Sequence, residues 1–181
     1  LASPLRDVYK RQTVEAAKKG QAYQEDFDRL YQYYLKHRLG DTQLMSWKQT
    51  ISDGKVAAED HNATDGDLYI AYSLLEASHQ WPKQAKKYQA QAKAILGDIL
   101  KYNYNEETGV LTVGNWANGD SDFYHLMRTS DTLPAQFQVF YEVTQDPKWL
   151  DIKEKMLKQL DTISSQSNTG LLPDFIWVEE Q

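Results

Sequence analysis

Apolar residues recur along much of this chain at intervals of three and four, the spacing that places side chains on one face of a helix. The pattern is clearest between Gln21 and Leu39, where charged residues occupy the opposite face. Gly40 follows this stretch and is predicted to end the helix. Similar stretches predict helices from Pro82 to about Leu100, from residue 130 or 131 past Tyr141, and over 149–163.

Only short segments lack this helical spacing. Extended pieces are predicted near Leu44 and Leu111, and a polar loop is predicted over 50–62 with a turn at Asp53-Gly54. The chain is therefore predicted to be all-α, with little strand.

The stretch from Asp65 to Trp81 differs from the other predicted helices, because apolar residues cover almost every side of it. A helix of this kind is enclosed by other elements. Two carboxylates, Asp65 and Asp67, stand at its start. One interpretation is structural, since Thr64 and Asp67 resemble a capping box and acids in a first turn favour the helix dipole. The other is a functional site at the open end of a buried helix.

A repeat of helical hairpins is indicated by glycine and tryptophan. Three times a tryptophan follows a glycine after seven residues: Gly40 and Trp47, Gly109 and Trp116, Gly170 and Trp177. Hairpins that cannot bury their apolar faces alone must stack on their neighbours. The pattern therefore predicts inner and outer helices alternating around a ring.

The repeated tryptophans are candidate sugar-binding residues. An indole packs its plane against the apolar C–H face of a sugar ring and also carries a hydrogen-bond donor. The alternative is that Trp47, Trp116 and Trp177 simply pack the ends of their hairpins. Trp81 and Trp149 lie at predicted helix junctions and are interpreted as structural.

Composition excludes several classes of function. The 181 residues carry a formal net charge of −6, which argues against binding to nucleic acid. No apolar run approaches the length of a membrane span, so no membrane partner is expected. With no cysteine, and with four histidines of which none pair at i, i+3 or i+4, neither a metal site nor a cofactor is predicted.

The string from Ala63 to Trp81 (ATDGDLYIAYSLLEASHQW) resembles the signature of glycoside hydrolase family 8. The resemblance implies an (α/α)6 barrel, of which this chain would supply about half. It also implies inverting hydrolysis of a β-1,4-linked polysaccharide, with Asp65 as the active-site residue that holds the sugar at the cleavage point.

Two further segments resemble substrate loops of that family: Asn115-Trp116-Ala117, and Arg128 to Asp131 with Pro134 following. Asp131 could bind a sugar hydroxyl or cap the next helix, and the sequence leaves both open. The complete set of predicted substrate-binding residues is Trp47, Asp67, Trp116, Tyr124, Arg128, Asp131 and Trp177.

The resemblance also implies that the catalytic acid and base lie elsewhere. The family's general acid is a glutamate in a Ser-Glu-Gly context before the first helix, and this chain has no such string. Residues 1–12, which resemble translated sequencing adaptor, stand in its place, and residues 13–181 are taken as a partial catalytic domain. The general base is expected after the Pro173-Asp174-Phe175 segment and beyond Gln181. The fragment alone is therefore expected to be inactive.

The parent protein is predicted to be a secreted bacterial endoglucanase that acts as a monomer on cellulose or mixed-linkage β-glucan. Xylan and chitosan remain open as substrates, because the family accepts them. A non-catalytic carbohydrate-binding toroid is the alternative of another class, and a purely structural helical-repeat domain is a third.

Overall fold

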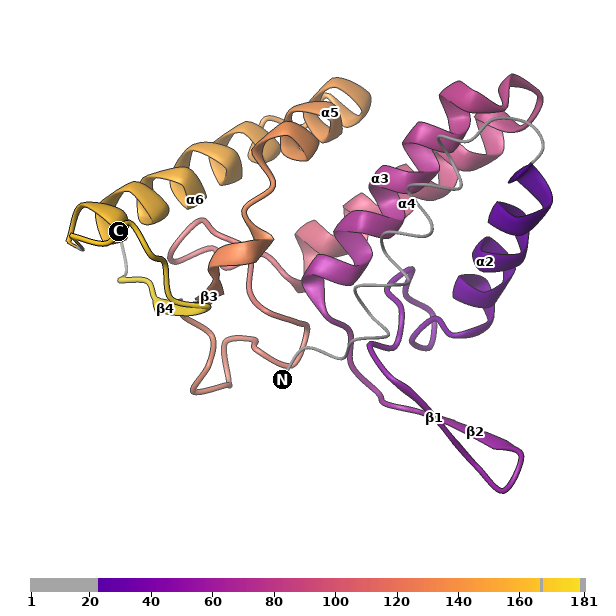
Figure 1. Ribbon diagram of the computed structural model, residues 1–181, viewed down its shortest axis with the longest axis horizontal. Coiled ribbons are helices and arrows are strands. Elements are labelled where there is room, and N and C mark those ends of the chain that lie inside the picture. The colour runs from indigo at the N-terminus through magenta and orange to yellow at the C-terminus, as the bar shows by residue number, and fades with distance from the viewer. Residues whose placement is uncertain (1–22, 167, 180–181) are drawn as a thin grey trace. The chain divides into compact units, whose positions relative to one another are not determined.

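The computed structural model describes residues 23–166 and 168–179, so the prediction for residues 1–12 lies outside the described part. The chain forms two compact units, Leu1–Ile99 and Leu100–Gln181, and each is described by itself. Most of the described chain is helical, as the sequence predicted (Figure 1). None of the helices in these residues combines the length and the apolar character needed to cross a lipid bilayer.

The first unit contains the helices that the apolar spacing predicted. They are α2 (Gln24–Lys36), α3 (Thr64–Gln80) and α4 (Ala85–Tyr102), with the short 3-10 helix η2 (Pro82–Gln84) between the last two. The last three residues of α4 belong to the second unit. Pro82 occupies the first turn of η2, where the missing N–H of proline leaves no helical bond unmade. The predicted boundaries are correct to within a few residues.

The core of this unit surrounds α3. Buried residues lie on all sides of that helix, as predicted: Thr64, Asp65, Asp67, Leu68, Ile70, Ala71, Ser73, Leu74, Leu75, Ala77 and Ser78. At the C-terminal end of α3, the ring centroid of Phe27 from α2 lies 5.1 Å from that of Trp81 and 5.4 Å from that of Tyr88. Trp81 is buried in this cluster, which confirms its structural role.

The prediction of an irregular loop over residues 50–62 is wrong. Strands β1 (Gln49–Ser52) and β2 (Lys55–Ala58) form an antiparallel hairpin that projects from the helices of the first unit (Figure 1). Its turn lies at Asp53-Gly54, as predicted, and both residues have positive φ, 50° and 72°. Turns of this kind match the twist of two-residue hairpins. The two strands are short and show no alternation of apolar and polar residues, so this stretch carries no strand signal in the sequence.

The second unit contains β3 (Leu126–Arg128), the 3-10 helix η3 (Thr129–Asp131), α5 (Pro134–Thr144), α6 (Lys148–Ser165) and β4 (Phe175–Trp177). Helices α5 and α6 pack through Phe137, Phe140 and Trp149, whose rings lie 5.1–6.3 Å apart. Trp149 is fully buried there, as its predicted structural role requires.

The capping role considered for Asp131 is wrong. The N-cap of α5 is Leu133, which makes no side-chain capping bond, and Pro134 begins the helix. Asp131 lies instead at the end of η3. The proline fixes a helical φ at the first position, so this helix begins without a polar cap.

Pairing between β3 and β4 brings distant parts of the second unit together. Leu126 lies opposite Trp177 in the register, and the N–H of Val178 donates to the His125 carbonyl at 3.0 Å.

The glycines of the proposed repeat share a conformation: φ is 51° at Gly40, 70° at Gly109 and 69° at Gly170. A left-handed backbone at all three positions supports their equivalence, since glycine adopts it without steric strain.

Candidate functional site

Asp65 and Asp67, the two acids of the string that resembles the family 8 signature, lie in the first turn of α3. Asp65 is 5% exposed, and its Oδ1 accepts the N–H of Gly66 at 2.7 Å. The exposed N–H groups at a helix start favour negative charge. Asp65 is thus an anchored carboxylate at the polar end of a helix whose remainder is enclosed by apolar side chains.

Asp67 faces protein donors. It is 1% exposed; its Oδ1 accepts the N–H of Met45 at 2.9 Å, and its Oδ2 accepts Asn62 Nδ2 at 2.8 Å. Both carboxylate oxygens therefore hold the chain in place. This geometry favours a positioning role for Asp67 over the direct substrate contact expected from the sequence.

The segment that Asp67 holds leads directly to Trp47. Its backbone is fixed on both sides of Met45: the Tyr34 hydroxyl donates to the Gln43 carbonyl at 2.8 Å, and the Trp47 N–H donates to the His61 carbonyl at 3.0 Å. Burial raises the pKa of the Tyr34 phenol, and the charge of Asp67 raises it further, so the hydroxyl remains a donor. Trp47 is half-buried at the base of the β1–β2 hairpin.

In the second unit, three aromatic side chains form an exposed row. Phe123 lies between the two repeated tryptophans, with ring centroids 5.6 Å from Trp116 in an edge-on arrangement and 6.2 Å from Trp177 in a stacked one. Trp116, Phe123 and Trp177 are 41%, 45% and 61% exposed. Packing of hairpin ends would bury these rings, so their exposure favours the ligand-binding interpretation for Trp116 and Trp177.

The other predicted binding residues of this unit differ in their surroundings. Tyr124 is partly exposed and lines a cavity. Arg128 donates to Asp174 Oδ1 at 3.1 Å and lies over the Phe175 ring, so it holds β3 against the segment that leads into β4. Asp131 is buried in η3, and its contact with a sugar stays a prediction.

Sequence reasoning missed Phe123, Glu107 and His125. Phe123 follows a run of turn-forming residues, and an aromatic residue in such a loop was the one available signal. His125 is one of the four histidines without metal-ligand spacing, yet its Nε2 lies 2.7 Å from Glu107 Oε2. This pair joins residues 18 positions apart, which no helical or strand spacing indicates.

One group of potential metal ligands lies within the described residues: Glu59, Asp60 and His61, with ligand atoms within 4.8 Å of one another. His61 Nδ1 already contacts Asp60 Oδ1 at 2.7 Å, and Lys48 Nζ lies 3.7 Å from Glu59. Exposed acids beside a lysine are common on surfaces, and we assign no metal to them.

A helical chain with anchored acids at the start of a buried helix and an exposed aromatic row has the features of a carbohydrate-active protein. Residues 20–181 match the model of the glycosyl hydrolases family 8, and the chain belongs to this family. Solved members are (α/α)6 barrels, and this chain covers about half of one, which confirms the predicted fold class.

Individual relatives agree with this assignment. A β-glucanase from Niallia circulans is 37% identical over 154 residues, which cover 83% of this chain and 37% of the relative. An endoglucanase from Bacillus sp. (strain KSM-330) is 32% identical over 136 residues, 74% of this chain and 28% of the relative. The apo structure of a β-1,3-1,4-glucanase from Paenibacillus sp. X4 superposes with a TM-score of 0.85 at 29% identity, covering 96% of this chain and 47% of that one. The chain thus spans less than half the length of these three proteins.

Proposed function

We propose that the protein is an inverting glycoside hydrolase that cleaves β-1,4 bonds in cellulose or mixed-linkage β-glucan. The proposal is supported by membership of family 8 and by relatives described as β-glucanase and endoglucanase. The observation that carries it is the exposed Trp116–Phe123–Trp177 row in a chain whose α3 begins with an anchored, enclosed carboxylate. Because such polymers lie outside cells, we further infer that the protein is secreted.

In this mechanism Asp65 holds the sugar ring at the cleavage point. Inversion requires a carboxylic acid that protonates the leaving oxygen and a carboxylate that activates water, roughly 6.5–9.5 Å apart. We assign neither role to a carboxylate described here. Asp65 instead accepts hydrogen bonds from hydroxyl groups of the distorted ring, and bonds that strengthen in the transition state accelerate the chemical step. Its bond from Gly66 orients the carboxylate before the sugar arrives.

The aromatic row suits a glucan chain. Equatorial hydroxyls leave both faces of a β-linked glucosyl ring apolar, so that successive rings can lie against Trp116, Phe123 or Trp177. Such surfaces also bind xylan, which shares the equatorial arrangement. An activity assay on each polysaccharide must therefore distinguish glucan from xylan as the substrate.

The function is tested with protein expressed from the longest open reading frame that contains these residues. We expect reducing sugar to be released from mixed-linkage β-glucan and from carboxymethyl-cellulose, with inverted configuration of the new reducing end by NMR. Faster release of reducing sugar from xylan or chitosan would instead identify that polysaccharide as the substrate, within the same family. Binding of glucan without hydrolysis would establish a carbohydrate-binding protein, and the absence of both would leave a structural role.

The aromatic row yields a separate prediction. Substitution Trp177→Ala should weaken cello-oligosaccharide binding about tenfold, because an indole covers roughly 50 Å² of sugar and each Å² contributes roughly 25 cal/mol. Phe123→Ala should also weaken binding, since its ring supports both tryptophans. Isothermal titration with cellotetraose measures both effects.

Leu171→Ala is the matched control for these variants, since Leu171 is an exposed apolar side chain of the same unit that lies outside the row. Equal losses in Leu171→Ala and Trp177→Ala would contradict the assignment of the row as a sugar-binding surface.

A further inference from the structure

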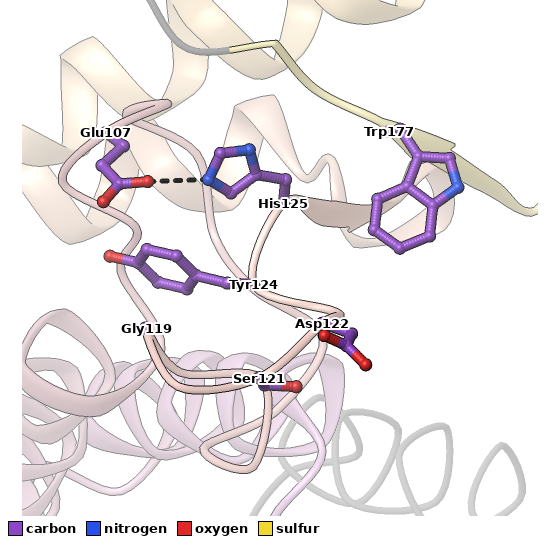
Figure 2. A pocket seen from close by; sticks show the side chains of 7 residues that line it. All are labelled: Glu107, Gly119, Ser121, Asp122, Tyr124, His125 and Trp177. Atoms are coloured by element: carbon purple, nitrogen blue, oxygen red, sulfur yellow. Dashed lines mark hydrogen bonds and ion pairs between the residues drawn. The ribbon is translucent and has the colours of Figure 1, made fainter.

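Beside the aromatic row, the second unit contains a cavity of about 340 Å³. Seven residues line it: Glu107, Gly119, Ser121, Asp122, Tyr124, His125 and Trp177. Figure 2 shows the His125 imidazole directed at the Glu107 carboxylate, with Ser121 and Asp122 on the loop that forms another wall. Trp177 belongs both to the cavity and to the row, so the two surfaces are continuous.

One buried residue, Asn105, holds two walls of this cavity. Its Nδ2 donates to the Tyr124 carbonyl at 2.8 Å, while its Oδ1 accepts the N–H of Glu107 at 2.8 Å and that of Thr108 at 3.1 Å. The bond from the Val178 N–H to the His125 carbonyl ties β4 to the same loop. The positions of Glu107, Tyr124 and Trp177 are therefore set by the fold before a ligand binds, which reduces the entropy lost on binding.

The chemistry of the lining is that of a site for a hydroxyl-rich ligand without negative charge. Carboxylates at Glu107 and Asp122 accept bonds from hydroxyls, Ser121 and Tyr124 can donate or accept, and the indole offers an apolar face. No lysine or arginine is among the lining residues. Of the nearby cations in this unit, Arg128 is bonded to Asp174 and Lys148 to Glu106.

We propose that this cavity is a sugar subsite that takes an uncharged β-linked glucosyl unit, and that Glu107 and Asp122 exclude uronic acids from it. The inference rests on the proposed function and adds a specificity to it. A uronate carboxylate placed about 6 Å from Glu107 would be repelled by an energy equivalent to roughly tenfold in Kd at an effective dielectric constant near 40. His125 orients the Glu107 carboxylate at 2.7 Å and is a positioning residue.

The test compares the affinities of two tetrasaccharides, cellotetraose and its counterpart oxidised to glucuronic acid at C6. Isothermal titration is performed in an Asp65→Asn background of the protein from the longest reading frame, so that neither ligand is cleaved. We expect Glu107→Gln to lower the ratio of the two dissociation constants, uronate over cellotetraose, about tenfold, because the amide can still accept a hydroxyl hydrogen bond but no longer repels the uronate. Asp122→Asn, on an exposed loop, should change the ratio in the same direction.

The control is Glu106→Gln, which removes the same charge from the neighbouring position in the same turn but from a residue outside the cavity. We expect it to leave the ratio unchanged. Equal ratios in Glu106→Gln and Glu107→Gln, or equal weakening of both ligands by Glu107→Gln, would overturn the inference. Should Glu107→Gln fail to fold, Asp122→Asn decides alone. Absence of cellotetraose binding in the parent protein would instead refute the proposed function.

Discussion

Replacement of Asp65 by asparagine should lower kcat/KM for β-glucan by about three orders of magnitude, equivalent to roughly 4 kcal/mol of transition-state stabilisation. The amide oxygen of asparagine can still accept the Gly66 N–H that Asp65 binds at 2.7 Å, so the backbone is retained. The lost charge sits in the first turn of α3, where it contributes only about 0.3–1 kcal/mol to stability. Activity should therefore fall far more than the thermal unfolding temperature.

Initial rates of reducing-sugar release, measured alongside thermal unfolding, test this expectation. Asp60→Asn is a suitable control, because Asp60 is an exposed carboxylate five residues earlier that lies outside α3. An unchanged kcat/KM in Asp65→Asn would assign this residue to helix stabilisation alone, and the family assignment would then rest on sequence and fold.

The helices could be predicted because each carries its own periodic signal. Burial of α3 follows from apolar residues on all sides of it, and the role of Gly40, Gly109 and Gly170 follows from their constant distance to a tryptophan. Local spacing does not encode pairing between distant segments. The β3–β4 ladder joins residues about 50 positions apart and depends on tertiary packing, so no window of sequence could indicate it.

The same distinction applies to the candidate site residues. Asp65 and the tryptophans were proposed from the sequence because they belong to recognisable strings. Glu107 meets His125, and Phe123 meets Trp116 and Trp177, only through the fold, in which Asn105 and the β3–β4 ladder hold the segments concerned. Asp67 was recognised as important, but its role could not be read from the sequence. An acid in a first turn can cap, bind a ligand or anchor another segment, and only the positions of Met45 and Asn62 decide among these.

Asp67→Asn should reduce the free energy of unfolding by about 2–3 kcal/mol, a larger effect on stability than that of Asp65→Asn. Both oxygens of Asp67 accept protein donors, from Met45 at 2.9 Å and Asn62 at 2.8 Å. An asparagine has one acceptor oxygen, so its amino group must face one of these donors. A buried donor without an acceptor costs about 1–3 kcal/mol, and the loss of a charged acceptor weakens the remaining bond.

The double variant Asn62→Asp with Asp67→Asn tests the geometry directly. In it, the oxygen of residue 67 can accept the Met45 N–H, and its amino group can donate to the new carboxylate at position 62. We expect recovery of about 1–2 kcal/mol relative to the sum of the two single variants, measured by urea unfolding as a double-mutant cycle. Strictly additive losses would show that these side chains do not share a bond. Recovery would establish that the side chains at positions 62 and 67 share a hydrogen bond at the start of α3.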